Sequence, residues 1–333
     1  MIGTKGVFDP LLPGLAGALD PQLMSSRLVP LLDDAPPRGC RAIAVEVLKH
    51  KPGRRCSLSY LLEGPGWQGR LFAKTYAGNR GAGIFTVMER LFRALPRQEL
   101  VVPCPLAYFS DMKLLVTEYI DGVPFAQSLY LEPSDGAACR AASALAALHG
   151  CGASLARRWT AVHEVNNAER WTAVLSGRAG REPERARLLL SELQARARDL
   201  EIVSESTVHR DFYAEQLWDA GGTTAMLDLD DTRSGDGALD VGNFLAHLTL
   251  RPMQFPGTAT GCAQAREPFL REYSRRAAGR ILGSAFQERV RFFEAASLLR
   301  LACVYAARER WSASLPPLLL DAAEHLLSVG MPR

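Results

Sequence analysis

The sequence has few of the features that mark secreted, metal-stabilised or redox proteins. Its seven cysteines are an odd number, and no two of them have CxxC spacing. They are Cys40, Cys56, Cys104, Cys139, Cys151, Cys262 and Cys303. We therefore expect neither a disulfide framework nor a structural zinc site, and we expect a reducing, cytoplasmic location.

Long apolar runs are also missing. The first residues, MIGTKGVFDPLLPG, lack the basic start and apolar core of a signal peptide. No run approaches the ~20 apolar residues that a membrane-spanning helix needs, so we expect no membrane association. The net charge of +3 by itself argues neither for nor against nucleic acid. Since no other feature indicates nucleic acid, we expect no such partner.

The charges that are present are unevenly divided along the chain. Residues 1–115 contain 15 Lys and Arg against 9 Asp and Glu, whereas residues 116–333 contain 24 against 27. A basic first part and an acidic second part suit a site for an anionic nucleotide on one side and a metal or cationic substrate on the other. Random scatter of charge is the alternative.

One stretch, residues 208–248, carries the groups from which chemistry can be inferred. It contains the tripeptide HRD at residues 209–211, and Gln216 follows Asp211 by five residues. An apolar strand then ends in Asp228, and Asp240 opens an apolar helix. Phosphoryl transfer from a metal–nucleotide needs such a set: a base near the attacking hydroxyl, an amide oxygen on the metal, and a metal carboxylate after a short hairpin.

This stretch resembles the aminoglycoside phosphotransferase and choline kinase group of small-molecule kinases, which share the protein-kinase-like fold. The resemblance extends from about Arg41 to the C-terminal helices. It implies an α+β, two-lobe fold, with a small antiparallel β-sheet in a nucleotide-binding N-lobe at residues 41–120 and a larger, mainly helical C-lobe at residues 121–333. Residues 1–40 lie outside the resemblance as an N-terminal extension, either packed on the first lobe or acting as a lid on the substrate side.

The resemblance also implies a role for each polar residue of the stretch. Asp211 would be the catalytic base, Gln216 and Asp228 would hold Mg²⁺, and His209 and Asp240 would support the loop. For Asp211 the alternative is a local turn bond, which does not explain the spacing of Gln216 and Asp228. For Asp240 the alternative is a plain helix N-cap.

Gln216 departs from the resembled family, which usually has asparagine there. Both amides offer a carbonyl oxygen, a suitable hard ligand for Mg²⁺. Glutamine is longer by one methylene, so the site is either intact with a shifted metal or weakened. The second possibility motivates an alternative function, a catalytically weak regulatory pseudokinase that binds nucleotide.

The segment 42–76 predicts an antiparallel meander of three strands joined by the turns KPGRRC and GPGWQG. The first turn takes the place of a kinase glycine-rich loop but has one glycine, and its Arg54 is a candidate phosphate contact. A solvated basic hairpin is the alternative. In the resembled family, the lysine corresponding to Lys74 of the third strand contacts the α and β phosphates.

A helix carboxylate holds that lysine in the resembled family, and Glu89 is the candidate here. Glu89 lies on an amphipathic helix expected at 83–95. The alternative for Glu89 is an i,i+4 pair with Arg93.

The resembled family binds the adenine edge through backbone groups of the segment between the lobes. This implies Glu118, Tyr119 and Ile120 as the adenine segment. The rest of the chain shows mainly helical spacing, including expected helices at 156–175 and 181–200.

The sequence therefore predicts an ATP-dependent phosphotransferase that uses Mg²⁺ to transfer the γ-phosphate to a hydroxyl of a small molecule. An amine-bearing alcohol, a sugar and a polyol are all allowed as acceptors. A protein kinase is disfavoured because no Ala-Pro-Glu segment follows Asp228. Asp240 follows Asp228 by only twelve residues, which leaves no room for a long activation loop.

Overall fold

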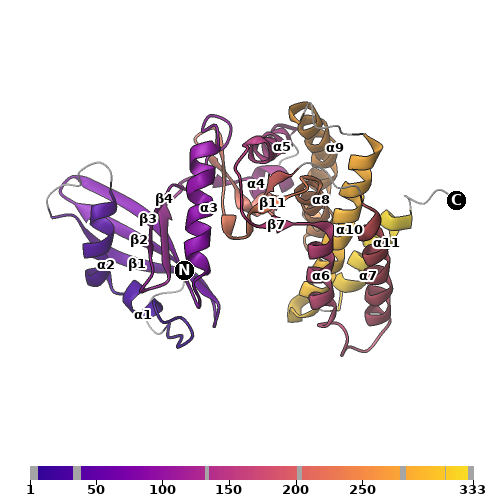
Figure 1. Ribbon diagram of the computed structural model, residues 1–333, viewed down its shortest axis with the longest axis horizontal. Coiled ribbons are helices and arrows are strands. Elements are labelled where there is room, and N and C mark those ends of the chain that lie inside the picture. Colours follow the sequence, from indigo (N-terminus) through magenta and orange to yellow (C-terminus); the bar gives the residue numbers. More distant parts are fainter. Residues whose placement is uncertain are drawn as a thin grey trace. The chain divides into compact units, whose positions relative to one another are not determined.

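The computed structural model describes residues 7–32, 39–131, 135–200, 205–277, 283–311 and 313–328. The chain divides into two compact units (Figure 1). Unit 1 comprises residues 1–94 and 101–121, and unit 2 comprises residues 95–100 and 122–333.

Unit 1 is built on a five-stranded sheet of order β1-β2-β3-β5-β4, in which every neighbouring pair is antiparallel. Its strands are β1 (Arg41–Lys51), β2 (Arg55–Gly64), β3 (Trp67–Tyr76), β4 (Pro105–Phe109) and β5 (Leu114–Glu118). The predicted meander of the first three strands is confirmed. Leu58, Tyr60 and Leu62 alternate along β2 and are all buried, as the two-residue period of a strand requires.

Three helical segments accompany this sheet. They are α1 (Leu15–Ala18), α2 (Pro21–Leu28) and α3 (Arg80–Ala94). Asp20 begins α2 by accepting bonds from the backbone N–H groups of Gln22 and Leu23 at 2.8 and 3.2 Å, an ordinary N-cap. Leu12, Leu15, Ala18, Met24 and Leu28 belong to the same buried cluster as the inward residues of β1–β3. Residues 7–32, here called the N-terminal segment, therefore contribute to the core of unit 1.

Unit 2 is mainly helical (Figure 1). Its helices are α4 (Phe125–Tyr130), α5 (Asp135–Gly150), α6 (Ala161–Thr172), α7 (Glu182–Asp199), α8 (Ala238–Gln254), α9 (Ala259–Arg276), α10 (Ser284–Ala306) and α11 (Leu315–Ser328). α10 packs against α6, α7, α8 and α11, and buried residues occur all around it, as expected of a central helix.

Two small sheets interrupt these helices. One has the order β10-β9-β6 and the other the order β7-β11-β8. The strands are β6 (Val123–Pro124), β7 (Arg158–Trp159), β8 (Ser206–Val208), β9 (Leu217–Ala220), β10 (Thr223–Met226) and β11 (Arg233–Gly235). Short 3-10 turns, η2 (Ala214–Gln216) and η3 (Leu229–Asp231), join them.

The prediction of a helix at 156–175 is wrong for the first residues of that range. Arg158 and Trp159 form β7, which pairs in parallel with Ser234 and Gly235 of β11. Helix α6 begins only at Ala161, after Thr160, whose hydroxyl caps it. Helical periodicity could not reveal β7, because its partner strand lies about 75 residues further along the chain.

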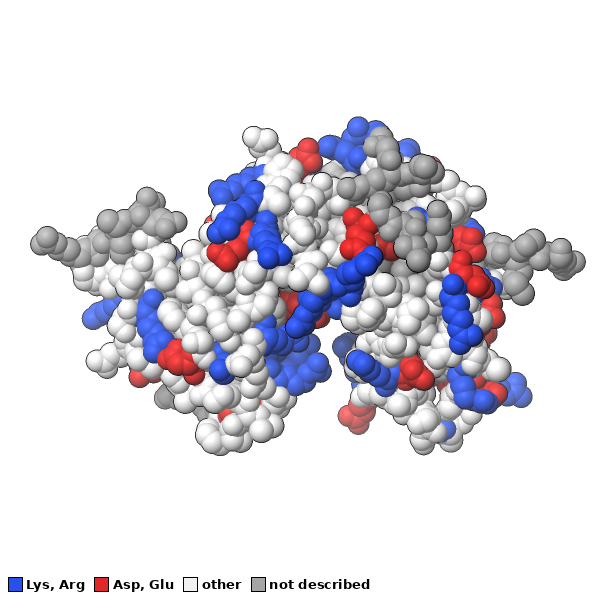
Figure 2. Space-filling model, in the orientation of Figure 1, with Lys and Arg blue, Asp and Glu red and all other residues white. Residues whose placement is uncertain are grey.

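Basic and acidic side chains are interspersed on the face shown in Figure 2. No helix among the described residues is long and apolar enough to cross a membrane.

Candidate active site

Asp240 anchors the loop that follows β8. It lies near the start of α8 and is fully buried. Its two carboxylate oxygens accept bonds from the backbone N–H groups of His209 at 2.6 Å and Arg210 at 2.7 Å. The imidazole of His149 lies 3.0 Å from the same carboxylate. These bonds hold Arg210 at φ 72°, a left-handed conformation that a non-glycine residue adopts only when its surroundings impose it.

His209 connects this loop to the strand that ends in Asp228. Its ring is buried, and its Nε2 donates to the carbonyl oxygen of Leu227 at 2.8 Å. Its Nδ1 accepts a bond from the backbone N–H of Asp211 at 3.3 Å. The N–H of Leu227 donates to the carbonyl oxygen of Gln216 at 2.8 Å. The backbones of Asp211, Gln216 and Asp228 are thus tied together through His209 and Leu227.

A second network holds the same loop from the side of α8 and α10. The Asn243 amide donates to the carbonyl oxygen of Phe212 at 3.0 Å and accepts from Arg300 at 2.8 Å. Arg300 lies 4.0 Å from Glu164, which accepts a bond of 2.8 Å from the Trp159 indole. Sequence reasoning missed Asn243 and Arg300. The position of Asn243, three residues after Asp240 on one helix face, was the available signal.

Arg210 and Trp159 join the two networks. The Arg210 guanidinium lies 3.3 Å from the centre of the Trp159 ring, so the cation stacks on the aromatic face. Its Nη1 also donates to the Asp231 carbonyl oxygen at 3.4 Å. Burial lowers the pKa of Arg210, and the charge of Asp231 opposes that shift.

Asp211 is half-buried. Burial raises the pKa of its carboxyl group, Arg300 and His209 oppose the rise, and the carboxylates of Asp228 and Asp231 add to it. A carboxylate whose pKa is raised above its ordinary range is a better proton acceptor than an exposed one.

Gln216 and Asp228 supply the oxygen atoms that could hold a cation. Gln216 is buried at the end of η2, and its side-chain amide has no hydrogen-bond partner among the described residues. Asp228 has φ 55° and begins η3. No group of three or more His, Cys, Asp or Glu side chains that could hold a metal occurs in the described part of the chain. One amide and one carboxylate still fit Mg²⁺, which binds few protein oxygens and keeps water and substrate phosphate as its other ligands.

The candidate nucleotide residues lie in unit 1. Lys74 is buried in β3, and its Nζ lies 5.9 Å from the centre of the Phe72 ring. Glu89 is one third exposed on α3 and pairs with Arg93 at 3.2 Å, which was the alternative considered for it. Arg54 is exposed at the tip of the β1–β2 hairpin.

Asp9 holds that hairpin tip. Its carboxylate accepts a bond from the backbone N–H of Gly53 at 2.8 Å and lies 2.8 Å from Nε2 of His50. Gly53 has φ +67°, which glycine adopts at little cost. No motif pointed to Asp9.

The adenine segment suggested by the resemblance lies at the end of β5. The N–H of Glu118 donates to the Cys104 carbonyl oxygen at 2.9 Å, and the Glu118 side chain accepts a bond from the N–H of Cys104 at 3.3 Å. The Tyr119 ring lies under the Arg70 guanidinium at 4.6 Å. Ile120 follows outside the strand.

Comparisons with known proteins agree with this fold. The model of the phosphotransferase enzyme family matches residues 57–282, and the chain therefore belongs to that family. No curated protein matches the chain. The family resemblance seen in the sequence is confirmed.

Solved structures share the fold at low identity. A putative aminoglycoside phosphotransferase from Ralstonia eutropha has a TM-score of 0.63 and 16% identity, over 92% of this chain and 97% of that one. Choline kinase LicA from Streptococcus pneumoniae has a TM-score of 0.61 and 13% identity, over 93% and 99%. An aminoglycoside phosphotransferase solved as a ternary complex with AMP-PNP and hygromycin B has a TM-score of 0.54 and 16% identity, over 88% and 96%. The predicted α+β, kinase-like two-lobe fold is confirmed.

Proposed function

We propose that the protein is an ATP-dependent kinase of small molecules, which uses Mg²⁺ to transfer the γ-phosphate to a hydroxyl group. The observation that carries the proposal is the backbone connection through Leu227. It ties together the backbones of the residues that carry the proposed base (Asp211) and the proposed metal ligands (Gln216 and Asp228). Family membership and a related fold solved with AMP-PNP support it.

In this proposal Asp211 acts on the acceptor. It accepts a hydrogen bond from the substrate hydroxyl, orients its oxygen, and takes its proton as the phosphoryl group is transferred. Phosphoryl transfer needs positioning and charge neutralisation more than covalent chemistry by the protein. The bond from the Asp211 N–H to His209 and the anchoring of the loop by Asp240 supply that positioning.

Gln216 and Asp228 are the proposed Mg²⁺ ligands. When bound, the metal neutralises the phosphate charges that develop during transfer. Lys74 is the proposed contact of the α and β phosphates, with Glu89 as its carboxylate and Arg54 as a further phosphate contact. The backbone of Glu118, Tyr119 and Ile120 is proposed to receive adenine. His209 and Asp240 act as structural support.

The acceptor is a small molecule with a free hydroxyl group. One of the similar structures contains hygromycin B, and another is named a choline kinase. An amine-bearing alcohol is therefore one candidate class of acceptor. A sugar or polyol is the other.

A regulatory pseudokinase is the second candidate, and Gln216 in place of asparagine favours it. Gln216→Asn separates the two. A faster reaction in this variant would indicate a site degraded by glutamine, and a slower one would indicate a site adapted to it.

The first test is thermal unfolding of the full chain with Mg–ATP, ATP with EDTA, or Mg²⁺ alone. At a ligand concentration about 100 times Kd, binding stabilises the fold by about 2.7 kcal/mol, which is a shift of several degrees. The shift should require both Mg²⁺ and ATP and should be lost in Asp228→Ala. No shift with any nucleotide tested would contradict the proposal.

A further inference from the structure

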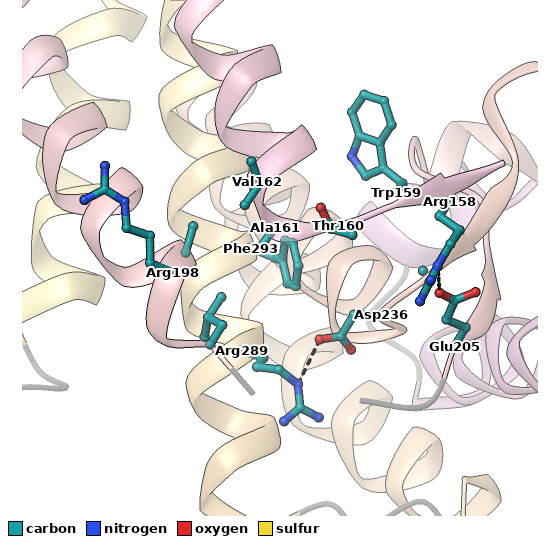
Figure 3. A pocket seen from close by; sticks show the side chains of 13 residues that line it. Arg158, Trp159, Thr160, Ala161, Val162, Arg198, Glu205, Asp236, Arg289 and Phe293 are labelled. Carbon is teal, nitrogen blue, oxygen red and sulfur yellow. Dashed lines mark ion pairs between the residues drawn. The ribbon is translucent and has the colours of Figure 1, made fainter. Parts of the chain in front are cut away.

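Unit 2 contains a cavity of about 330 Å³ that none of the residues assigned above to base, metal or nucleotide lines. Its walls come from β7, β11, α6, α7 and α10 (Figure 3). The volume lies at the lower end of the about 300–1,000 Å³ typical of small-ligand pockets. Most of its inner surface is apolar, and its apolar side chains are those of Trp159, Ala161, Val162, Ala197, Leu200 and Phe293.

Among the described lining residues, three arginines stand against two carboxylates. Arg158 forms an ion pair with Glu205, and Nε of Arg289 lies 2.8 Å from Asp236 (Figure 3). The third arginine, Arg198, is exposed on α7 and has no ion-pair partner among the described residues. An apolar cavity with one surplus arginine favours a ligand with an apolar body and one negative charge.

Strand β7 connects this cavity to the loop that bears Asp211, because both of its residues, Arg158 and Trp159, line the cavity. Successive side chains of a strand point to opposite faces, and Figure 3 shows Arg158 turned toward Glu205 while the Trp159 ring is turned away from Asp236 and Phe293. The Trp159 ring stacks on Arg210, the residue before Asp211. A ligand that contacts β7 therefore lies one strand away from the catalytic loop.

We propose that the cavity is a binding site for a small aromatic carboxylate, and that its occupancy is transmitted to the loop through β7 and the stack of Trp159 on Arg210. Because the candidate catalytic residues do not line the cavity, the ligand acts as an effector and not as the phosphoryl acceptor. The binding step does not depend on the proposed kinase activity.

Binding is tested on the full chain without nucleotide. Biphenyl-4-carboxylate, naphthalene-2-carboxylate and benzoate are titrated by calorimetry, with biphenyl-4-methanol as the uncharged control. Ala197→Trp fills the cavity from α7, and Val162→Trp fills it from α6. Arg198→Gln removes the surplus charge. Arg187→Gln is the matched control, because Arg187 lies on the same helix, pairs with Glu184 and does not line the cavity. Thermal unfolding verifies that each variant is folded.

We expect saturable binding of at least one carboxylate by the wild type and by Arg187→Gln. Binding should weaken about tenfold in Arg198→Gln, since a charge-assisted hydrogen bond contributes at least that factor. It should disappear in a folded tryptophan variant. The absence of saturable binding by all three carboxylates, or equal binding by Arg198→Gln and both tryptophan variants, would overturn the proposed site.

Transmission has its own readout. Because Trp159 itself lines the cavity, the readout is the backbone amide resonance of Arg210, which does not line it and should shift on carboxylate binding in the absence of nucleotide. It should not shift in Ala197→Trp. Saturable binding that leaves this resonance unchanged would overturn the coupling.

Discussion

Asp9 and Gly53 are 44 positions apart in sequence, and the Asp9 carboxylate accepts the Gly53 backbone N–H at 2.8 Å. This bond ties the N-terminal segment to the tip of the β1–β2 hairpin. The hairpin has a single glycine, and an acceptor outside the sheet fixes its conformation.

Asp9→Asn should loosen this hairpin. The Gly53 N–H bond and then His50 lower the pKa of Asp9. A carboxyl group whose folded pKa lies below its unfolded value stabilises the fold above the unfolded pKa, and that contribution is lost as the pH falls through the folded pKa. The wild type should therefore be more stable than Asp9→Asn at neutral pH, and the difference should shrink below about pH 4.

Hydrogen exchange of the Gly53 amide measures the local effect, which should be faster exchange in Asp9→Asn at neutral pH. Asp111→Asn is the control, because Asp111 pairs with Arg27 and not with the hairpin. Equal exchange in Asp9→Asn and the wild type would show that the bond does not hold the turn.

Asp240→Asn should be strongly destabilising. An amide has one acceptor oxygen, so it cannot accept from both the His209 and Arg210 N–H groups while facing His149. Leaving a buried donor unpaired costs about 1–3 kcal/mol, and urea unfolding should show a loss of about 2–4 kcal/mol in the free energy of unfolding. A loss below about 0.5 kcal/mol would mean that the loop does not depend on Asp240.

Asp211→Asn should abolish phosphoryl transfer and yet stabilise the fold at neutral pH. Burial is the main cause that raises the Asp211 pKa, and Asp228 and Asp231 add to it. For an acid with a raised folded pKa, stability falls as the pH rises from the unfolded pKa through the folded one, and the loss persists above it.

The neutral amide of Asp211→Asn avoids that loss of stability. The free energy of unfolding of this variant should therefore exceed that of the wild type by about 0.5–2 kcal/mol at pH 7. The gain should disappear below about pH 4. Urea unfolding at several pH values measures it, and a variant less stable than the wild type at pH 7 would contradict the direction.

Gly14→Ala should disrupt the packing of the N-terminal segment. A Cβ at this position would lie 1.8 Å from the carbonyl oxygen of Met112, so the backbone must move. Overpacking of this kind costs about 1–3 kcal/mol or more. Gly78→Ala is the control, because nothing lies within 4 Å of its added Cβ. Thermal unfolding should show a clearly lower melting temperature for Gly14→Ala and little change for Gly78→Ala.

Local patterns predicted the elements of unit 1 well. β-branched and aromatic residues in alternation, with turns such as KPGRRC between them, marked the first three strands, and apolar spacing marked α3. These signals are contained within about ten residues, so neighbouring sequence suffices to read them.

The contacts that assemble the candidate site could not be read in this way. Asp9 bonds Gly53, and Arg300 reaches Asn243 from 57 positions away. β7 has only two residues, and it is a strand only because it pairs with β11. Such contacts follow from how elements pack, which no periodicity encodes. Glu89 pairs with Arg93, its neighbour on the same helix. This pairing competes with the proposed pairing of Glu89 with Lys74.

The bonds that join His209 to Gln216 pass through the main chain of Leu227, not through its side chain. Leu227 donates to Gln216 and accepts from His209 through main-chain atoms. Side-chain exchange at position 227 therefore leaves both bonds available, and an alanine scan does not test them. Only chemistry that edits the backbone, such as replacement of the amide between Met226 and Leu227 by an ester, would remove the bond to Gln216 and show how much the loop depends on it.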